Sequence, residues 1–294
     1  MTVQVSRAKS RNLGVRVVRR GIRLSKPPKV VYWALGVVLV SSLFPFWWSF
    51  LVGSNGVGAV NADPRPLLPG GHFLENAANV VNSIPFWKAL GNSFIVSLSD
   101  SLAVVFFSTL AGYSFSKLTF RGRDRLLVFI IATTAVPSQL SVVPLFIAMS
   151  KFGWAGSLWA VIVPGLVTAF GVFWMTQYLR SALPFELIEA ARIDGCSMLS
   201  TFWHVGLPAA RPAATMLGLF TFVSTWNNFF WPLIVLDPGN PTLPVALQQL
   251  QAGFFVDYSL VLTGVLLVTA PLVLLFALAG RQLVAGIMAG AIKS

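Results

Sequence analysis

The chain has 294 residues, of which 56% are hydrophobic and only 10% charged, and its formal net charge is +12. A soluble globular domain carries roughly a quarter charged residues, so this composition cannot cover a water-exposed surface and excludes that class. It indicates an all-α, polytopic membrane protein. The basic residues mostly flank apolar runs instead of interleaving with aromatic residues, so we expect no nucleic-acid partner.

The first 29 residues hold nine lysines or arginines and no acid. This basic region is too long for the start of a signal peptide, and no small-residue cleavage site follows the next apolar run. We therefore expect a basic cytoplasmic arm over 1–29 that touches anionic lipid, and one membrane domain over 30–294.

Six segments of that domain approach or exceed the roughly 20 apolar residues that cross a bilayer as a helix. They are 30–52, 89–114, 126–148, 158–178, 212–235 and 259–279.

The basic residues are distributed unevenly between the connecting segments. With the N-terminus inside, only Arg65, Lys88 and Lys151 fall on the outer side, and the other 18 fall on the inner side. Inner loops carry the excess of lysine and arginine in membrane proteins, so both termini and the segment 179–211 are expected in the cytoplasm. The longest outer segment, 53–88, is expected to be irregular around "DPRPLLPGG".

The inner segment contains the polar stretch "EAARIDGCSMLSTFWHVGLP". A helix is expected to start at Pro184, and Asp194-Gly195 predicts a turn after it. Ser197 is placed to cap a second short helix, which we expect Pro208 and Pro212 to end. The local pattern leaves two alternatives: an amphipathic helix lying on the membrane surface, or a helix whose small residues Ala190 and Ala191 let a partner protein approach.

This stretch resembles the EAA motif of ABC-importer permeases, EAA-x2-DGA-x8-I-x-LP. Cys196 replaces the alanine and Val205 the isoleucine of the pattern. Residues 73–294 also resemble the carbohydrate-type permeases, in particular the smaller membrane subunit of maltose and glycerol-phosphate importers, in "LAGYSFSKLTFRGRDRL", "VPSQLSVVPLF" and "TFVSTWNNFFWPLIVL". The positions that match the motif are Glu189, Ala190, Ala191, Asp194, Gly195, Leu207 and Pro208.

The resemblance implies a six-span permease that imports a sugar, oligosaccharide or polyol in a prokaryotic plasma membrane. It implies a heterodimer with a second permease, two ATPase subunits inside and a solute-binding protein outside. The loop 184–208 would form a coupling helix, in which Glu189 contacts the ATPase, the two alanines allow a close fit, Gly195 makes the turn and Asp194 caps it.

No catalytic or metal site is expected in the chain itself. It lacks GxxxxGK[ST], so ATP and magnesium would be bound by the partner ATPase, and no cofactor is expected here. Cys196 is the single cysteine, and His72 and His204 lie far apart, which argues against a zinc site.

Asp100 is an acid near the middle of the second expected span, where a charge costs about 3 kcal/mol or more on an isolated helix. It shares a helical face with Ser93 and Ser97. It either contacts substrate in a cavity or makes a structural hydrogen bond to a neighbouring helix.

The fifth expected span carries a stripe of small polar residues. Such side chains either line a transport path or bond between helices. Trp226 and Trp231 are candidates to stack on a sugar ring or to anchor the span at the membrane interface. The stripe consists of Thr221, Ser224, Thr225 and Asn228, with Asn227 beside it.

The competing hypothesis is a secondary transporter driven by an ion gradient, with Asp100 as a proton or sodium site. The motif argues against it, and the ATP dependence of uptake separates the two.

Overall fold

The computed structural model describes residues 28–61, 67–252 and 255–291. The basic arm expected over 1–29 therefore lies almost wholly outside the described residues. Over those residues the secondary structure is helical, without a β-strand. The chain divides into two compact units, Met1–Pro45 and Phe46–Ser294, and the boundary falls within the first helix, α1 (Lys29–Gly53).

The second unit contains every other element. The helices after α1 are α2 (Phe73–Ser83), α3 (Phe86–Lys117), α4 (Arg123–Ala132), α5 (Val142–Lys151), α6 (Trp159–Gly165), α7 (Ala169–Ala182), α8 (Phe185–Ile193), α9 (Met198–Thr201), α10 (Leu207–Trp226), α11 (Phe230–Val235), α12 (Leu243–Gln249) and α13 (Tyr258–Ala291).

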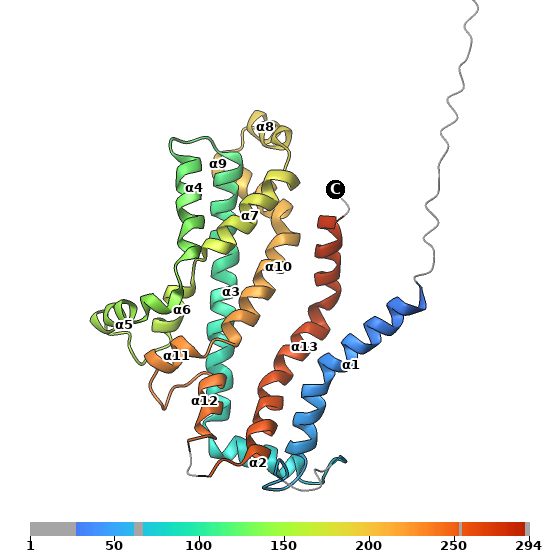
Figure 1. Cartoon of the computed structure of the whole chain (residues 1–294). Coiled ribbons are helices and arrows are strands. Elements are labelled where there is room, and N and C mark those ends of the chain that lie inside the picture. The colour runs from blue at the N-terminus through green and yellow to red at the C-terminus, as the bar shows by residue number, and fades with distance from the viewer. Residues whose placement is uncertain (1–27, 62–66, 253–254, 292–294) are drawn as a thin grey trace, which may run out of the picture. The chain divides into compact units, whose positions relative to one another are not determined.

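The long helix α3 forms the centre of this unit, and α7 and α10 pack along it (Figure 1). Their shared core includes the buried residues Val104, Met175 and Leu217. Ser101 donates a 2.6 Å hydrogen bond to the carbonyl of Gly218, which holds α3 against α10. A small residue at the contact allows two helix backbones to come this close, as is typical of helices packed in a membrane.

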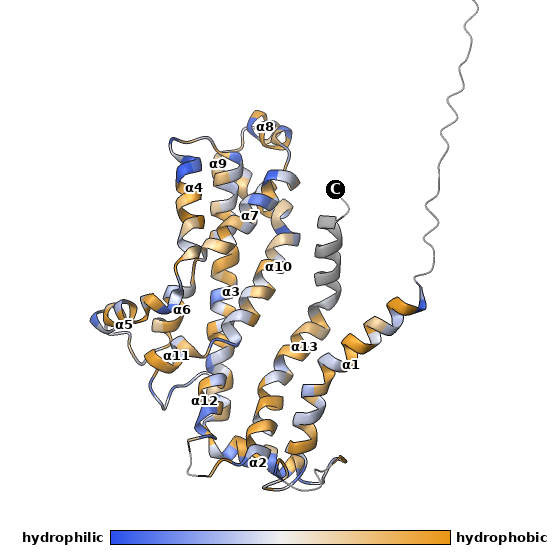
Figure 2. Ribbon diagram, in the orientation of Figure 1, coloured by the Kyte–Doolittle hydropathy of each residue, from blue (hydrophilic) through white to orange (hydrophobic). Residues whose placement is uncertain are grey.

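Four helical stretches in the described part of the chain are long and apolar enough to cross a membrane: Lys29–Gly53, Phe86–Lys117, Trp159–Ala182 and Tyr258–Leu278. Apolar residues cover much of these helices (Figure 2). A fifth is counted if Arg123–Ala135 and Ser138–Lys151, which meet at 91°, form one span. The prediction of an all-helical membrane protein is thus confirmed, whereas six uninterrupted spans are not found.

The expected span 126–148 is broken at Pro137. Val136 before the proline has extended backbone angles, as the proline ring favours, and the helix stops there. The chain then turns into a short 3₁₀ segment, Ser138–Ser141, and continues as α5.

Two more of the expected spans are interrupted. The span 158–178 breaks after Gly165 and restarts at α7, where Thr168 caps the new helix by accepting a 3.1 Å hydrogen bond from the amide of Gly171. The span 212–235 breaks at Asn227, whose side-chain amide donates to the carbonyl of Val223 at 2.8 Å and competes with the helical ladder.

The segment 53–88 contains the helix α2. Within "DPRPLLPGG" the described residues 67–71 are irregular, as expected, and the rest lies outside the described residues. One local expectation was wrong. Pro208 and Pro212 do not end the second short helix, since the chain stays helical from Met198 to Trp226. A π-helical turn over Phe202–Gly206 lies just before the first of these prolines, and Pro208 itself occupies the first turn of α10, where a missing N–H is tolerated.

Candidate functional site

The loop 184–208 begins with the short helix α8 and a tight turn, as its sequence predicts. The helix that starts at α9 after the turn runs on without a break into α10. Gly195 has φ of +84°, a left-handed conformation that side chains with a Cβ rarely adopt. The amides of Gly195 and Cys196 donate to the carbonyls of Arg192 and Ala191 at 3.0 and 2.9 Å, closing the end of α8. Ser197 then caps α9 by accepting a 3.2 Å hydrogen bond from the amide of Ser200.

This loop is seated firmly on one end of the bundle. Ile188 of α8 and Phe202 after α9 are buried in the same core as α3, α7 and α10. The Phe202 ring meets the Tyr113 ring edge-on, with centroids 5.6 Å apart. A displacement of the loop therefore has to move the helices on which it rests, because close-packed cores transmit displacement.

Lys117, at the end of α3, adds a polar contact to the loop. Its ammonium lies 4.5 Å from the centre of the Phe185 ring, the first residue of α8. It also donates to the carbonyl of Arg180 at 3.4 Å. One buried side chain thus links the ends of α3, α7 and α8.

The residues of the matched motif divide into two groups. Four of them are exposed on the surface of the loop: Glu189, Ala190, Asp194 and Gly195. Ala191 is 8% exposed and packs inward, so its small size serves the fit of α8 against its own chain. Leu207 and Pro208 are half-buried at the start of α10.

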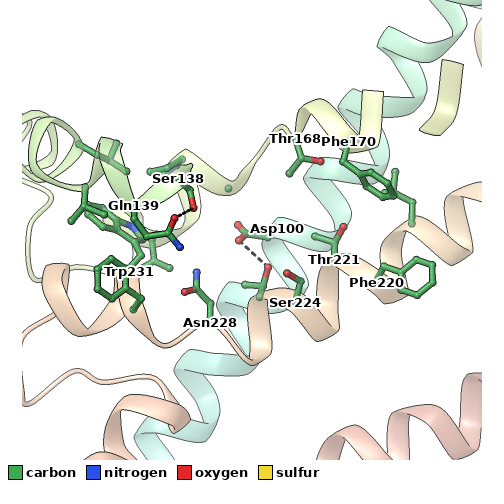
Figure 3. Close-up of a pocket in the computed structure, with 18 residues that line it drawn as sticks. Asp100, Ser138, Gln139, Thr168, Phe170, Phe220, Thr221, Ser224, Asn228 and Trp231 are labelled. Carbon is green, nitrogen blue, oxygen red and sulfur yellow. Dashed lines mark hydrogen bonds between the residues drawn. The ribbon is translucent and has the colours of Figure 1, made fainter. Parts of the chain in front are cut away.

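A second candidate site lies halfway along α3. It is a cavity of about 720 Å³ bounded by α3, α6, α7, α10 and α11 and by the bend before α5 (Figure 3). Asp100 lies 14 residues from the start of the 32-residue α3, which places it roughly 20 Å along the helix axis. The cavity is therefore at membrane depth. Its polar lining residues are Asp100, Ser138, Gln139, Thr168, Thr221, Ser224, Thr225 and Asn228.

Asp100 is 4% exposed and lies between α6 and α10. Its Oδ2 accepts a 3.4 Å hydrogen bond from the hydroxyl of Thr225, whereas Oδ1 has no protein partner among the described residues. A Cβ atom at Gly165 would overlap this carboxylate. The absence of a side chain at Gly165 therefore makes room for Asp100. The bond from Thr225 is the hydrogen bond to a neighbouring helix that one sequence alternative expects, whereas contact with a substrate stays a prediction.

The three interruptions of the expected spans meet at this cavity. Ser138 and Gln139 follow the first break, Thr168 lies at the second, and Asn228 lies at the third. Figure 3 shows these residues arranged around Asp100. Non-helical backbone is tolerated at membrane depth where it is buried in protein or lines a cavity. This explains why the breaks occur together in space although they are far apart in the sequence.

The polar stripe of α10 is placed largely as its spacing predicts. Thr221, Ser224, Thr225 and Asn228 all line the cavity, but Asn227 does not. Sequence reasoning missed Ser138, Gln139 and Thr168, for which Pro137 and Pro164 were the available signals.

The two tryptophans occupy different environments. Trp231 lines the cavity and donates to the carbonyl of Ala160 at 3.0 Å. Trp226 is 2% exposed, stacks on Phe222 and donates to the carbonyl of Val268 at 3.3 Å. It is a core residue and is not available to stack on a solute.

The described residues contain no group of three or more histidine, cysteine or acidic side chains arranged to hold a metal. A buried acid in a polar cavity halfway along a membrane-spanning helix is typical of a substrate or ion pathway, which points to the class of transport proteins.

Comparison with known proteins identifies the family. Residues 104–287 match the family described as binding-protein-dependent transport system inner membrane component, and the chain belongs to this family.

Two relatives extend over most of the chain. The arabinooligosaccharides transport system permease protein of Halalkalibacterium halodurans is 32% identical over 209 residues, covering 71% of this chain and 75% of that protein. The lactose transport system permease protein of Rhizobium radiobacter is 29% identical over 273 residues, covering 92% and 98%.

A third relative is the sn-glycerol-3-phosphate transport system permease protein of Escherichia coli, which is 28% identical over 263 residues, covering 86% and 92%. The fold is also that of a chain in the crystal structure of a bacterial ABC transporter involved in the import of the acidic polysaccharide alginate. The two share a TM-score of 0.73 and 22% identity over 86% of this chain and 95% of the other.

Proposed function

We propose that this chain is one of two permease subunits of an ATP-driven importer for a sugar, oligosaccharide or polyol. Each interrupted pair of helices counts as one span, which gives six spans over 30–294, with the arm 1–29, the loop 184–208 and the C-terminus in the cytoplasm. A second permease completes the path through a prokaryotic plasma membrane. Two separate ATPase chains bind ATP and magnesium, and a binding protein delivers the solute from outside.

The observation that carries the proposal is the loop 184–208. Its exposed motif residues lie on α8 and on the turn after it. The buried residues of the same loop belong to the core that α3, α7 and α10 share. We infer that Glu189, Ala190, Asp194 and Gly195 form the docking surface for the ATPase. Ala191, Leu207 and Pro208 hold that surface on the bundle. Closure of the ATPase pair would then move these helices and open the cavity to the other side.

The substrate path in this proposal runs through the cavity. Asp100, Ser224 and Asn228 present polar groups to it from two helices and one helix break. Names of relatives support a carbohydrate class, since arabinooligosaccharide and lactose permeases are among them.

The test is purification of the tagged chain from its native membrane, followed by reconstitution of whatever assembles with it. We expect an ATPase and a second permease to co-purify, and labelled sugar uptake to require ATP and the binding protein. Uptake that persists without ATP and stops when ionophores collapse the ion gradients would instead establish the secondary transporter. A chain that purifies alone and takes up no sugar would overturn the importer.

A further inference from the structure

We infer that Asp100 makes the cavity selective for uncharged polyhydroxylated solutes and excludes solutes that carry a carboxylate or a phosphate. The inference rests on the proposed function and deepens it, because it names which carbohydrates pass. It is a property of this permease cavity itself, additional to any selection made by a binding protein.

The first argument is the balance of charge. Asp100 is the one ionisable residue among the described residues that line the cavity, which include no lysine, arginine or histidine. A solute with a negative charge would meet a carboxylate and no compensating cation. Like charges brought together at a desolvated contact are strongly unfavourable, and proteins use this repulsion to reject wrong ligands.

The second argument is the unpaired oxygen. Asp100 is nearly fully buried, its Oδ2 has only the 3.4 Å hydrogen bond from Thr225, and its Oδ1 has no protein donor among the described residues. A buried carboxylate requires donors, and a sugar presents several hydroxyl groups that can donate. Oδ1 is itself buried, so a rotation of the carboxylate toward the cavity would bring it within reach of a solute hydroxyl, and its missing donor favours that rotation.

The third argument is the rest of the lining. The hydroxyl of Ser224 and the amides of Gln139 and Asn228 both donate and accept, as neighbouring sugar hydroxyls need. Trp231 and Phe230 supply apolar faces of the kind that pack on the C–H face of a sugar ring. A cavity that combines these groups with a lone carboxylate suits a neutral polyol better than an anion.

Relatives of this chain include a glycerol-3-phosphate permease, so the family as a whole does not exclude anions. The selectivity assigned here is therefore particular to residues of this chain and is not a restatement of the family.

The experiment uses the complete importer in lipid nanodiscs without its binding protein, so that only the membrane subunits select. The probes are matched pairs: lactose and lactobionate, arabinobiose and its aldonate, and glycerol and glycerol 3-phosphate. Binding is measured by saturation-transfer NMR, which detects weak ligands. In the wild type we expect the dissociation constant of the anionic member of each pair to be at least about ten times that of the neutral member. In Asp100→Asn this ratio of dissociation constants should fall to about three or less.

A second variant guards against misfolding of Asp100→Asn. Ser138 is exposed on the opposite wall of the cavity, and Ser138→Lys places a cation facing Asp100 while leaving the carboxylate in place. It should lower the ratio of the anionic to the neutral dissociation constant, as Asp100→Asn does. Ser181→Lys, which adds the same charge on an exposed position outside the cavity lining, should leave the ratio at its wild-type value.

The inference is overturned if the anion binds as well as the neutral sugar in the wild type, or if neither cavity variant changes the ratio. Tighter binding of an amino sugar such as lactosamine than of lactose would also overturn the assignment to an uncharged solute. ATP-driven uptake of a neutral sugar alongside any of these results would leave the proposed function standing. Absence of ATP-driven uptake of every sugar and polyol would remove both.

Discussion

The two candidate sites of this molecule are built in opposite ways. The loop 184–208 is assembled from residues that are neighbours in the sequence, and its turn and cap are local, although its buried face packs on α3, α7 and α10. The cavity around Asp100 is assembled from one intact helix and three helix breaks that are up to about ninety residues apart in the chain. The difference fits the proposed roles, because a docking surface has to keep its shape, whereas a path for a solute needs walls that several moving helices share.

The sharpest way to separate the two sites is Gly195→Val. A β-branched residue at φ of +84° is strongly strained, so the turn should open and ATP-driven uptake should fall by more than about tenfold. Uptake and ATP hydrolysis are measured in reconstituted vesicles. Gly153→Val is the matched control, because Gly153 also has positive φ and open space around it but lies far from the loop. Equal losses in both variants would show that strain alone, and not docking, explains the effect.

The corresponding change at the cavity is Gly165→Ala. The new Cβ overlaps the Asp100 carboxylate, and overpacking of this kind costs about 1–3 kcal/mol, so uptake should fall roughly fivefold or more. Co-purification of the ATPase should be unchanged, since the loop is not altered. Gly91→Ala, in α3 with nothing near the added atom, should behave as wild type. If the ATPase no longer co-purified with the Gly165 variant, the cavity and the loop would not be independent sites.

A smaller effect is expected from Lys117→Met, which keeps the apolar stem and removes the contacts with Phe185 and Arg180. A cation–π contact contributes about 0.5–1 kcal/mol or more, so transport per ATP hydrolysed should fall about two- to fivefold. The ratio of uptake to ATP hydrolysis is the readout, and Lys151→Met, at an exposed position, is the control. An unchanged ratio would mean that the link from α3 to α8 does not carry coupling.

An effect of similar size is expected to separate two adjacent asparagines. Asn228 lines the cavity and Asn227 bonds to its own helix. Asn228→Ala should raise the apparent KM for the transported sugar about three- to fivefold, the worth of one hydrogen bond of about 1 kcal/mol. Asn227→Ala should change it less than about twofold. The reverse order would place the solute path on another face of α10.

The accuracy of the sequence predictions follows the same division. Asp194, Gly195 and Ser197 determine their own backbone, so the turn and the cap were predictable from neighbouring residues alone. Thr221, Ser224 and Thr225 were predictable from helical periodicity, because they lie on one face of α10, and Asn228 joins them from the break that follows.

The rest of the cavity was not predictable in this way. Apolar content alone shows that 126–148 is long enough to span, but it does not show that the helix bends at Pro137. The same limit applies to the break before Thr168. Whether a proline within an apolar run bends or ends a helix depends on tertiary contacts that satisfy the freed backbone groups, and those contacts come from distant segments.

The continuous helix from Met198 to Trp226 has a mechanical consequence. At 1.5 Å per residue it is about 43 Å long, and it begins at the loop and ends beside the cavity. A tilt of about 5° of such a rod about one end displaces the other by roughly 4 Å. That distance exceeds the length of the hydrogen bond between Thr225 and Asp100. The helix is therefore a lever arm long enough for a small rotation at the loop to make or break a single contact halfway along α3.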